Sequence, residues 1–188
     1  MDTLFPPPDP DPVVAAVPVG TRIETAEGVH GLATATYDRT EQYRFRLSRV
    51  WDASGRRCVF LMLNPSTATA EVLDPTVTRC VGFAKAWGFG ALEVVNVFAL
   101  RSTDPKRLYD HDDPVGPGND DALVAAAQAA ALTVAAWGVH AALHGREAQV
   151  RALFSDVDVP LKCLRTTKDG HPGHPLYVPA NTRLLDWP

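Results

Sequence analysis

Cysteine is scarce in this sequence, and its spacing excludes two kinds of metal site. The 188 residues include only three cysteines, Cys58, Cys80 and Cys163, and no Cys-x-x-Cys pair. Three widely separated thiols cannot alone supply a four-thiolate zinc site or an ordinary four-cysteine iron–sulfur cluster. Such scattered cysteines are typical of reduced thiols in a cytosol, so we expect a cytoplasmic protein.

Long apolar runs and an excess of positive charge are also lacking. The longest apolar-rich run, residues 123–137, is alanine-rich and interrupted by Gln128, so we expect no membrane span. No charged segment followed by an apolar stretch opens the chain, and we predict no secretory signal. Eighteen Lys and Arg against 22 Asp and Glu give a formal net charge of -4. This balance argues against nucleic-acid binding by bulk positive charge, although it permits a local basic groove.

Several catalytic motifs are missing as well. The Trp-Gly-Phe-Gly segment at residues 87–90 lies between a predicted helix and a predicted strand, which is the wrong context for a phosphate-binding loop and excludes kinase and nicotinamide-dependent classes. Ser66 has no Gly-x-Ser-x-Gly surroundings, which disfavours a serine hydrolase. His140 and His144 have a metal-chelating spacing but no third ligand, and we interpret them as helix surface. We therefore expect no metal and no cofactor.

The composition indicates one globular domain that follows a tail. Hydrophobic residues make up 46% of the chain, enough for a single core. Residues 1–20 are rich in proline and aspartate, a composition that favours solvated, extended backbone, so we predict a disordered tail there. Residues 21–188 then form a single domain, which we expect to be monomeric.

The hydrophobic pattern changes along that domain. Residues 32–37 and 43–47 alternate apolar and polar side chains, as half-buried antiparallel strands do, with Arg44 and Arg46 on the outer face. Strands and helices then alternate: strands are predicted at 58–63, 92–98, 132–137 and 161–164, and helices at 74–87, 119–131 and 139–154. This order predicts an α/β fold, a three-layer α/β/α sandwich whose central, mostly parallel four-stranded sheet carries N-terminal antiparallel edge strands.

Polar residues follow or end each of the four central strands. Ligands bind outside the carboxyl ends of strands in such sheets, so these residues are the first site candidates. They are residues 64–67 (Asn-Pro-Ser-Thr), Asn96, residues 137–138 (Trp-Gly), and His171 and His174. Asn-Pro-Ser-Thr is also a common turn sequence. An amide inside a buried strand needs a hydrogen-bonding partner, so Asn96 meets either a ligand or a structural group.

Basic residues are numerous near these positions in spite of the net charge. They are Arg79, Lys85, Arg101, Lys106, Arg107, Lys162, Arg165 and Lys168. They can form a phosphate-facing surface or be scattered over the domain.

Taken in order, the four strand ends resemble the uracil-DNA glycosylase superfamily over residues 57–180. The motifs that carry the resemblance are Leu-Asn-Pro-Ser at 63–66, Val-Val-Asn-Val-Phe at 94–98, Trp-Gly at 137–138 and His-Pro-Gly-His-Pro at 171–175. At closer range the chain resembles the bacterial family called domain of unknown function 1643, through Met-Leu-Asn-Pro-Ser-Thr-Ala at 62–68, Asp-Pro-Thr at 74–76, Asn-Val-Phe-Ala-Leu-Arg at 96–101 and His-Pro-Leu-Tyr at 174–177. That second family does not by itself imply a reaction.

The glycosylase resemblance implies a monofunctional enzyme that hydrolyses the N-glycosidic bond of a deaminated or damaged base in DNA. It implies that Asn64 holds the attacking water, that His174, or His171 in another register, donates to the base oxygen, and that Asn96 pairs with the base edge. Phe83 or Phe98 would stack on the base, and Ser66 replaces a tyrosine that excludes thymine in many relatives. Of the basic residues above, we expect Arg79, Arg101 and Lys168 to contact DNA or phosphate. Tyr177 either serves as a wedge into the duplex or the wedge is absent.

Two other classes stay open from the residues. The last loop reads His-Pro-Leu-Tyr where the resemblance leads us to expect His-Pro-Ser or Asn-Pro-Ser, the start of the usual wedge into DNA. With the acidic charge balance, this favours as an alternative a nucleotide- or nucleoside-binding protein, or a hydrolase of a free modified nucleotide, that uses the same pocket without DNA. A third class is a non-catalytic interaction domain. The expected partner is therefore DNA or a free nucleotide, and not a membrane.

Overall fold

Eight strands form one mixed sheet in the computed structural model, which describes residues 20–188. The strands are β1 (Arg22–Gly28), β2 (Gly31–Tyr37), β3 (Arg44–Val50), β4 (Arg57–Met62), β5 (Ala91–Asn96), β6 (Leu132–Ala135), β7 (Leu161–Cys163) and β8 (Leu185–Trp187). The helices are α1 (Pro75–Ala86), α2 (Arg107–Asp110), α3 (Asn119–Gln128) and α4 (Arg146–Asp156), with the 3-10 helices η1 (Val139–Gly145) and η2 (Pro175–Tyr177). The predicted proline-rich tail lies outside the described residues, apart from its last residue, Gly20.

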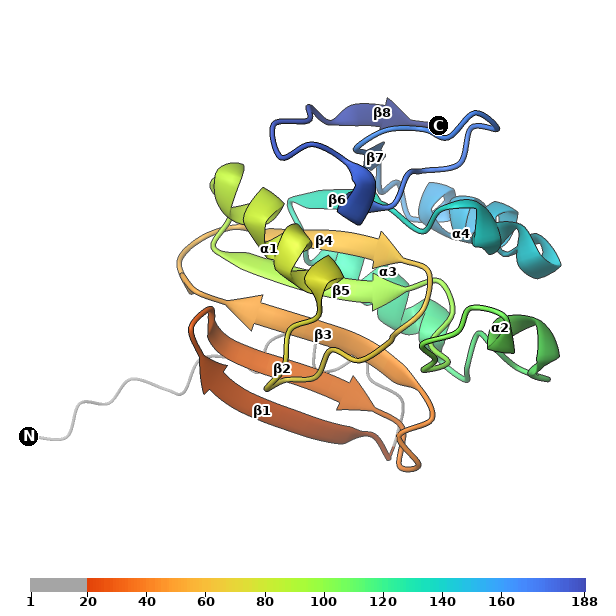
Figure 1. The fold of residues 1–188 in the computed structure, drawn as a ribbon, viewed down its shortest axis with the longest axis horizontal. Helices are drawn as coiled ribbons and strands as arrows, with labels where there is room; N and C mark the ends of the chain where they lie inside the picture. Colours follow the sequence, from red (N-terminus) through yellow and green to blue (C-terminus); the bar gives the residue numbers. More distant parts are fainter. Residues whose placement is uncertain (1–19) are drawn as a thin grey trace, which may run out of the picture.

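The strand order is β1-β2-β3-β5-β4-β6-β7-β8. The four strands β5, β4, β6 and β7 are parallel, and β1, β2 and β3 are antiparallel to their neighbours. The arrowheads of β4 and β5 point the same way in Figure 1. The predicted parallel centre with antiparallel N-terminal strands is thus confirmed. Strands β1 and β8 were not predicted, because β1 is polar and largely exposed and β8 has only three residues.

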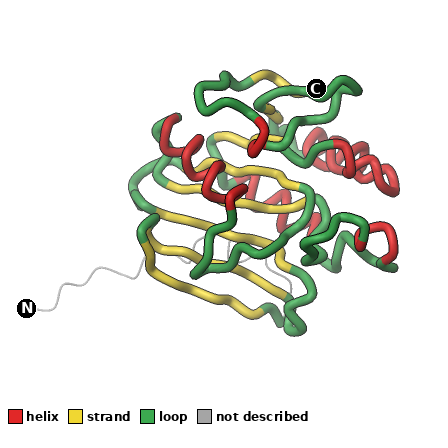
Figure 2. Tube along the Cα trace, in the orientation of Figure 1, coloured by secondary structure: helices red, strands yellow, loops and turns green. Residues whose placement is uncertain are grey.

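Helices cover both faces of the parallel strands. Along β4, Phe60 packs in one core cluster with Phe83 of α1, and Leu61 packs in another with Leu123 of α3 and Phe154 of α4. Side chains alternate between the two faces of a strand, so neighbouring residues of β4 meet different helices. Figure 1 shows α1 in front of the sheet, and Figure 2 shows the loops that join these helices to the strand ends. Within residues 20–188 no helix is long and apolar enough to cross a membrane.

The predicted start of α1 is confirmed in atomic detail. The Asp74 carboxylate accepts a 2.7 Å hydrogen bond from the backbone N–H of Val77, and Pro75 occupies the first helical position. This bond satisfies one of the free N–H groups at the helix N-terminus, and proline lacks an N–H that would need a partner there. The local sequence alone is therefore enough to place Asp74 at the end of the loop that follows β4.

The prediction of one helix over residues 139–154 is wrong. The chain forms the short helix η1 and then α4, because Leu143 and His144 have non-helical dihedrals and Gly145 is left-handed with a φ of 66°. Glycine adopts this conformation at little cost, so Gly145 permits the break. The predicted helix that begins at Asn119 is confirmed as α3, but Asn119 does not cap it: its side chain donates to the backbone oxygen of Asn96 over 2.9 Å, and Gly118 precedes the helix.

The outer face predicted for Arg44 and Arg46 is a second correction. Both side chains are buried, and Arg46 forms an ion pair with the fully buried Glu93 of β5, which Arg57 also contacts at 2.9 Å. Alternation in the sequence distinguishes the two faces of a strand, but it cannot say that both faces are covered. An ion pair compensates the buried charge of Arg46, whereas Arg44 has none within residues 20–188.

Candidate functional site

A cavity of about 430 Å³ lies at the carboxyl ends of the parallel strands. It receives residues from the segments that follow or end β4, β5, β6 and β7, which is where the sequence placed its candidates. Five of the predicted site residues line it: Asn64, Ser66, Asn96, His174 and Tyr177. A cavity of this size suits a small organic ligand.

Asn96, the last residue of β5, is buried without a hydrogen-bonding partner for its side chain. It is 1% exposed, and neither Nδ2 nor Oδ1 bonds to any group within residues 20–188. Leaving buried polar atoms unpaired costs about 1–3 kcal/mol. The sequence left open whether Asn96 meets a ligand or a structural group. The described part of the chain offers no structural partner, so the amide is available to a ligand in the cavity.

Asn64 is held in one orientation by its backbone surroundings. Its Nδ2 donates to the carbonyl oxygens of Ser102 at 2.8 Å and Pro65 at 3.0 Å. The Ser102 N–H in turn donates to the oxygen of Pro65 over 2.9 Å, so the two loops are joined. With both bonds made by the nitrogen, the side-chain oxygen of Asn64 is the atom left to accept a hydrogen bond from water or a ligand.

His174 lines the cavity as a neutral hydrogen-bond donor. The backbone N–H of Leu176 donates to its Nδ1 over 3.3 Å, which leaves the ring proton on Nε2. Burial lowers the pKa of His174 below 6.5, and the nearby Asp74 carboxylate opposes this shift only in part. At neutral pH the ring therefore presents an uncharged Nε2–H group.

His171, the alternative motif histidine, lies outside the cavity. Its Nδ1 is 2.8 Å from Oε2 of Glu147, and the same oxygen accepts a 2.9 Å hydrogen bond from the indole of Trp137. The N–H of Gly138 also donates to the oxygen of Pro172 over 2.8 Å. These contacts tie the final loop to the segment after β6. The structure thus gives the two histidines different surroundings, and only His174 reaches the cavity.

Phe83 and Phe98, predicted to stack on a base, lie in the core instead. Phe83 points from α1 toward the sheet and stacks on Trp87 with ring centroids 5.3 Å apart. Phe98 is fully buried in the cluster on the opposite face. Neither ring lines the cavity, because helical and strand periodicity direct both side chains into the two core clusters.

None of the predicted phosphate contacts Arg79, Arg101 and Lys168 lines the cavity itself. Arg79 donates to the backbone oxygen of Val178, and Arg101 donates to the oxygen of Glu41 over 3.0 Å. Lys168 is exposed on the turn of the last loop. Arg101 lines an adjoining pocket that shares Ser66 and Ser102 with the cavity, whereas Arg79 and Lys168 line neither.

Two charged residues that the sequence analysis did not assign to the site line the cavity. Arg44 is the first residue of β3, and β3 runs antiparallel to β5, so the start of β3 lies at the carboxyl end of β5. Asp74 caps α1 and is the one carboxylate among the lining residues that the structure describes. Strand pairing was the signal that could have identified Arg44. A strand antiparallel to β5 places its first residues at the sheet edge where β5 ends. His140, read as helix surface, also lines the cavity, 3.2 Å from the Tyr109 hydroxyl.

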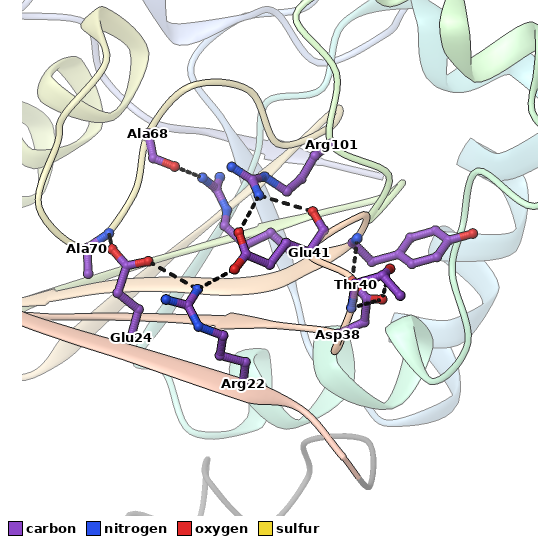
Figure 3. A network of polar contacts seen from close by, with 10 residues as sticks. Arg22, Glu24, Asp38, Thr40, Glu41, Ala68, Ala70 and Arg101 are labelled. Atoms are coloured by element: carbon purple, nitrogen blue, oxygen red, sulfur yellow. Dashed lines mark hydrogen bonds and ion pairs between the residues drawn. The ribbon is translucent and has the colours of Figure 1, made fainter.

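The N-terminal strands hold the loop that connects Asn64 to Asp74. Arg44 donates to the oxygen of Ala68, Arg49 donates to that of Thr69 over 2.6 Å, and Glu24 accepts from the N–H of Ala70 over 3.1 Å. Figure 3 shows the Ala68 and Ala70 contacts beside the ion pairs of Glu41 with Arg22 and Arg101. The antiparallel half of the sheet therefore positions two residues of the cavity lining.

The described part of the chain holds few groups suited to metal binding or thiol chemistry. Within residues 20–188 no three His, Cys, Asp or Glu side chains gather as a metal-binding group. All three cysteines are free and buried, and burial raises the pKa of the Cys58 and Cys80 thiols. They pack as small apolar side chains.

Comparison with known families gives one match, over residues 44–176, to the family described as Protein of unknown function (DUF1643). The chain belongs to the DUF1643 family. The matched segment runs from Arg44 to Leu176, so it contains every residue of the cavity lining except Tyr177. No curated protein and no solved structure matches the chain.

Proposed function

We propose that this DUF1643 protein is a glycosylase that hydrolyses the N-glycosidic bond of a deaminated base in DNA, with the cavity as its base pocket. The observation that carries the proposal is the unpartnered amide of Asn96. An amide presents a donor and an acceptor side by side, which match the C=O and N–H edge of uracil, hypoxanthine or xanthine. The Nε2–H of His174 supplies a further donor for a base carbonyl oxygen.

The reaction separates charge, and the cavity carries groups for both ends. A water oxygen bonds to the sugar carbon C1′, the C1′–N bond breaks, and its electron pair leaves with the base. The Asn64 oxygen positions the water but cannot take its proton near neutral pH. We assign that proton to Asp74, whose Oδ1 is held by Val77 while its other oxygen has no partner within residues 20–188.

We also propose the three-layer glycosylase-like arrangement for the fold. It is supported by α1 on one face of the parallel strands, by α3 and α4 on the other, and by a cavity at the strand ends. Tyr177 is the proposed wedge: it lines the cavity and is 72% exposed, with its ring centroid 5.6 Å from that of His174. A flipped nucleotide would leave a gap in the stack that such a ring can fill.

A second candidate is a hydrolase or binding protein for a free modified nucleotide. It is favoured by one observation: neither Arg79 nor Arg101 lines the cavity, and both donate to backbone oxygens of the protein. The pocket chemistry is the same in both candidates, and the substrate distinguishes them.

The test is base release from labelled oligonucleotides, single- and double-stranded, that carry uracil, hypoxanthine, xanthine or a mismatched thymine. Alkali-labile nicks made by the wild type, and lost in Asn64→Ala and His174→Ala, are expected. Asp169→Ala, an exposed change on the same loop, is the matched control and keeps activity. A folded protein that cuts none of these strands at enzyme excess, but releases base from a free deoxynucleotide, would establish the second candidate instead.

A further inference from the structure

Arg44 places a buried positive charge in the cavity without a carboxylate to pair with it. Its side chain is among the cavity lining and the residue is 2% exposed. Its Nη1 donates to the backbone oxygen of Ala68, while its Nε is buried and has no partner in the described part of the chain. Arg44 forms no ion pair with any Asp or Glu of residues 20–188, Asp74 included.

The neighbouring arginines of the same strand are compensated in other ways. Arg46 pairs with Glu93, and Arg49 donates to the backbone oxygens of Ser48 and Thr69. Asp74 attracts Arg44 but lies outside ion-pair distance, and the buried Nε of Arg44 stays unpaired. Burying a charge that no counter-charge contacts is unfavourable, so this arginine points to an anion that is not part of the fold. Burial lowers the pKa of Arg44 to about 10, which still leaves the guanidinium charged at neutral pH.

The cation lines the same cavity as the group proposed to read the base. The backbone N–H of Arg44 donates to the oxygen of Ala99 over 3.0 Å, three residues after Asn96, and both residues line the cavity. A charge in the pocket proposed to hold the base is placed to act on the base. His174 is a neutral donor, so Arg44 and His140 are the basic side chains left at the cavity, and only Arg44 is buried.

We propose that Arg44 is the anion-binding residue of this cavity and stabilises the negative charge of the departing base. This inference rests on the proposed glycosylase function. As the C1′–N bond breaks, its electron pair passes to the base ring, and the base leaves as a monoanion that accepts hydrogen bonds from the guanidinium. No proton from the protein is needed in this step, because the anion takes one from water after release.

Binding of two rings of the same size tests the charge preference without any turnover. Uracil is neutral at pH 7.5 and barbiturate is a monoanion, and calorimetry measures both affinities. We expect the wild type to bind barbiturate at least about tenfold more tightly than uracil, and Arg44→Met to bring the two affinities within about twofold. Arg49→Met is the matched control, because Arg49 is buried on the same strand and bonds the same loop but does not line the cavity. It keeps the preference.

Additional variants and a competing anion distinguish three outcomes: misfolding of a variant, binding of phosphate, and failure of the proposed function. Arg44→Lys keeps a charge and should retain part of the preference, and thermal unfolding shows that each variant folds. Orthophosphate that displaces barbiturate from the wild type but not from Arg44→Met would identify a nucleotide phosphate as the anion. An unchanged preference in Arg44→Met, or none in the wild type, overturns the inference. Arg44-dependent binding in a protein that cuts no oligonucleotide keeps the anion site and overturns the glycosylase.

Where cleavage is observed, the leaving group gives a second readout. The 5-fluorouracil anion is more stable than the uracil anion and needs less help to depart. In single-turnover assays, Arg44→Met should therefore slow cleavage of uracil-containing strands about tenfold more than it slows cleavage of 5-fluorouracil-containing strands. A purely structural role for Arg44 would lower both rates equally.

Discussion

Two buried polar groups on β5 lie three residues apart and have opposite fates. Glu93, in the middle of the strand, is completely buried and contacts Arg46 and Arg57. Asn96, at the carboxyl end, is equally buried, and its side-chain atoms have no partner in the described chain. The first group is compensated within the protein and serves the fold. The second faces the cavity, and we propose that a ligand compensates it there.

The largest expected effect tests the compensated half of this comparison. Glu93→Ala leaves two arginines without their shared carboxylate, and breaking a buried ion pair in this way costs about 3–5 kcal/mol. Urea unfolding should show this loss of free energy of unfolding. The exposed Lys162–Asp186 pair is the control, and Lys162→Ala should change stability by less than about 1 kcal/mol. Equal effects of the two substitutions would contradict the comparison.

Asn96→Leu tests the uncompensated half. The change keeps the side-chain volume and removes two unpaired polar atoms, so the free energy of unfolding should stay the same or rise by up to about 1 kcal/mol. Base release should fall about 100- to 1000-fold, as it does when a preorganised donor is removed from an active site. Stability that fell by several kcal/mol would show that Asn96 serves the fold after all.

Glu147 of α4 extends the comparison to the last loop. Its carboxylate contacts both Trp137, which lines the cavity, and His171 of that loop. Glu147→Ala leaves both partners unpaired and should lower the free energy of unfolding by about 1–3 kcal/mol. Hydrogen exchange at the Gly138 N–H, which bonds to Pro172, should accelerate because the loop is released. Asp169→Ala, an exposed change on the same loop, should leave this exchange unchanged.

The smallest effect is the pH dependence that His174 brings. Burial lowers its pKa in the folded protein below the unfolded value of 6.5, so between these two values the unfolded chain binds more protons. His174 therefore makes stability increase with pH through this window and lose that gain as pH falls below 6.5. Thermal unfolding of the wild type between pH 5 and 7 should show a steeper rise than that of His174→Gln. A parallel rise in both would show that the ring is not buried as described.

The strands and loops that carry the site were predictable from the sequence, because they depend on patterns between residues close together in the chain. Apolar runs placed β4 and β5, the Asp-Pro pair began α1, and the strand-helix alternation implied parallel strands. Parallel strands bring their carboxyl ends to one edge, so the sequence alone was enough to predict Asn64, Asn96 and His174 as neighbours.

The tertiary structure alone decided which charges and rings join those strands and loops at the site. Arg44 lines the cavity because β3 pairs antiparallel with β5. Phe83 does not line it, because its ring points from α1 into the core. The choice of His174 over His171 depends on Glu147, which lies on a separate helix. Periodicity reports which face of an element is apolar, but strand pairing and contacts between distant segments fix what each face meets.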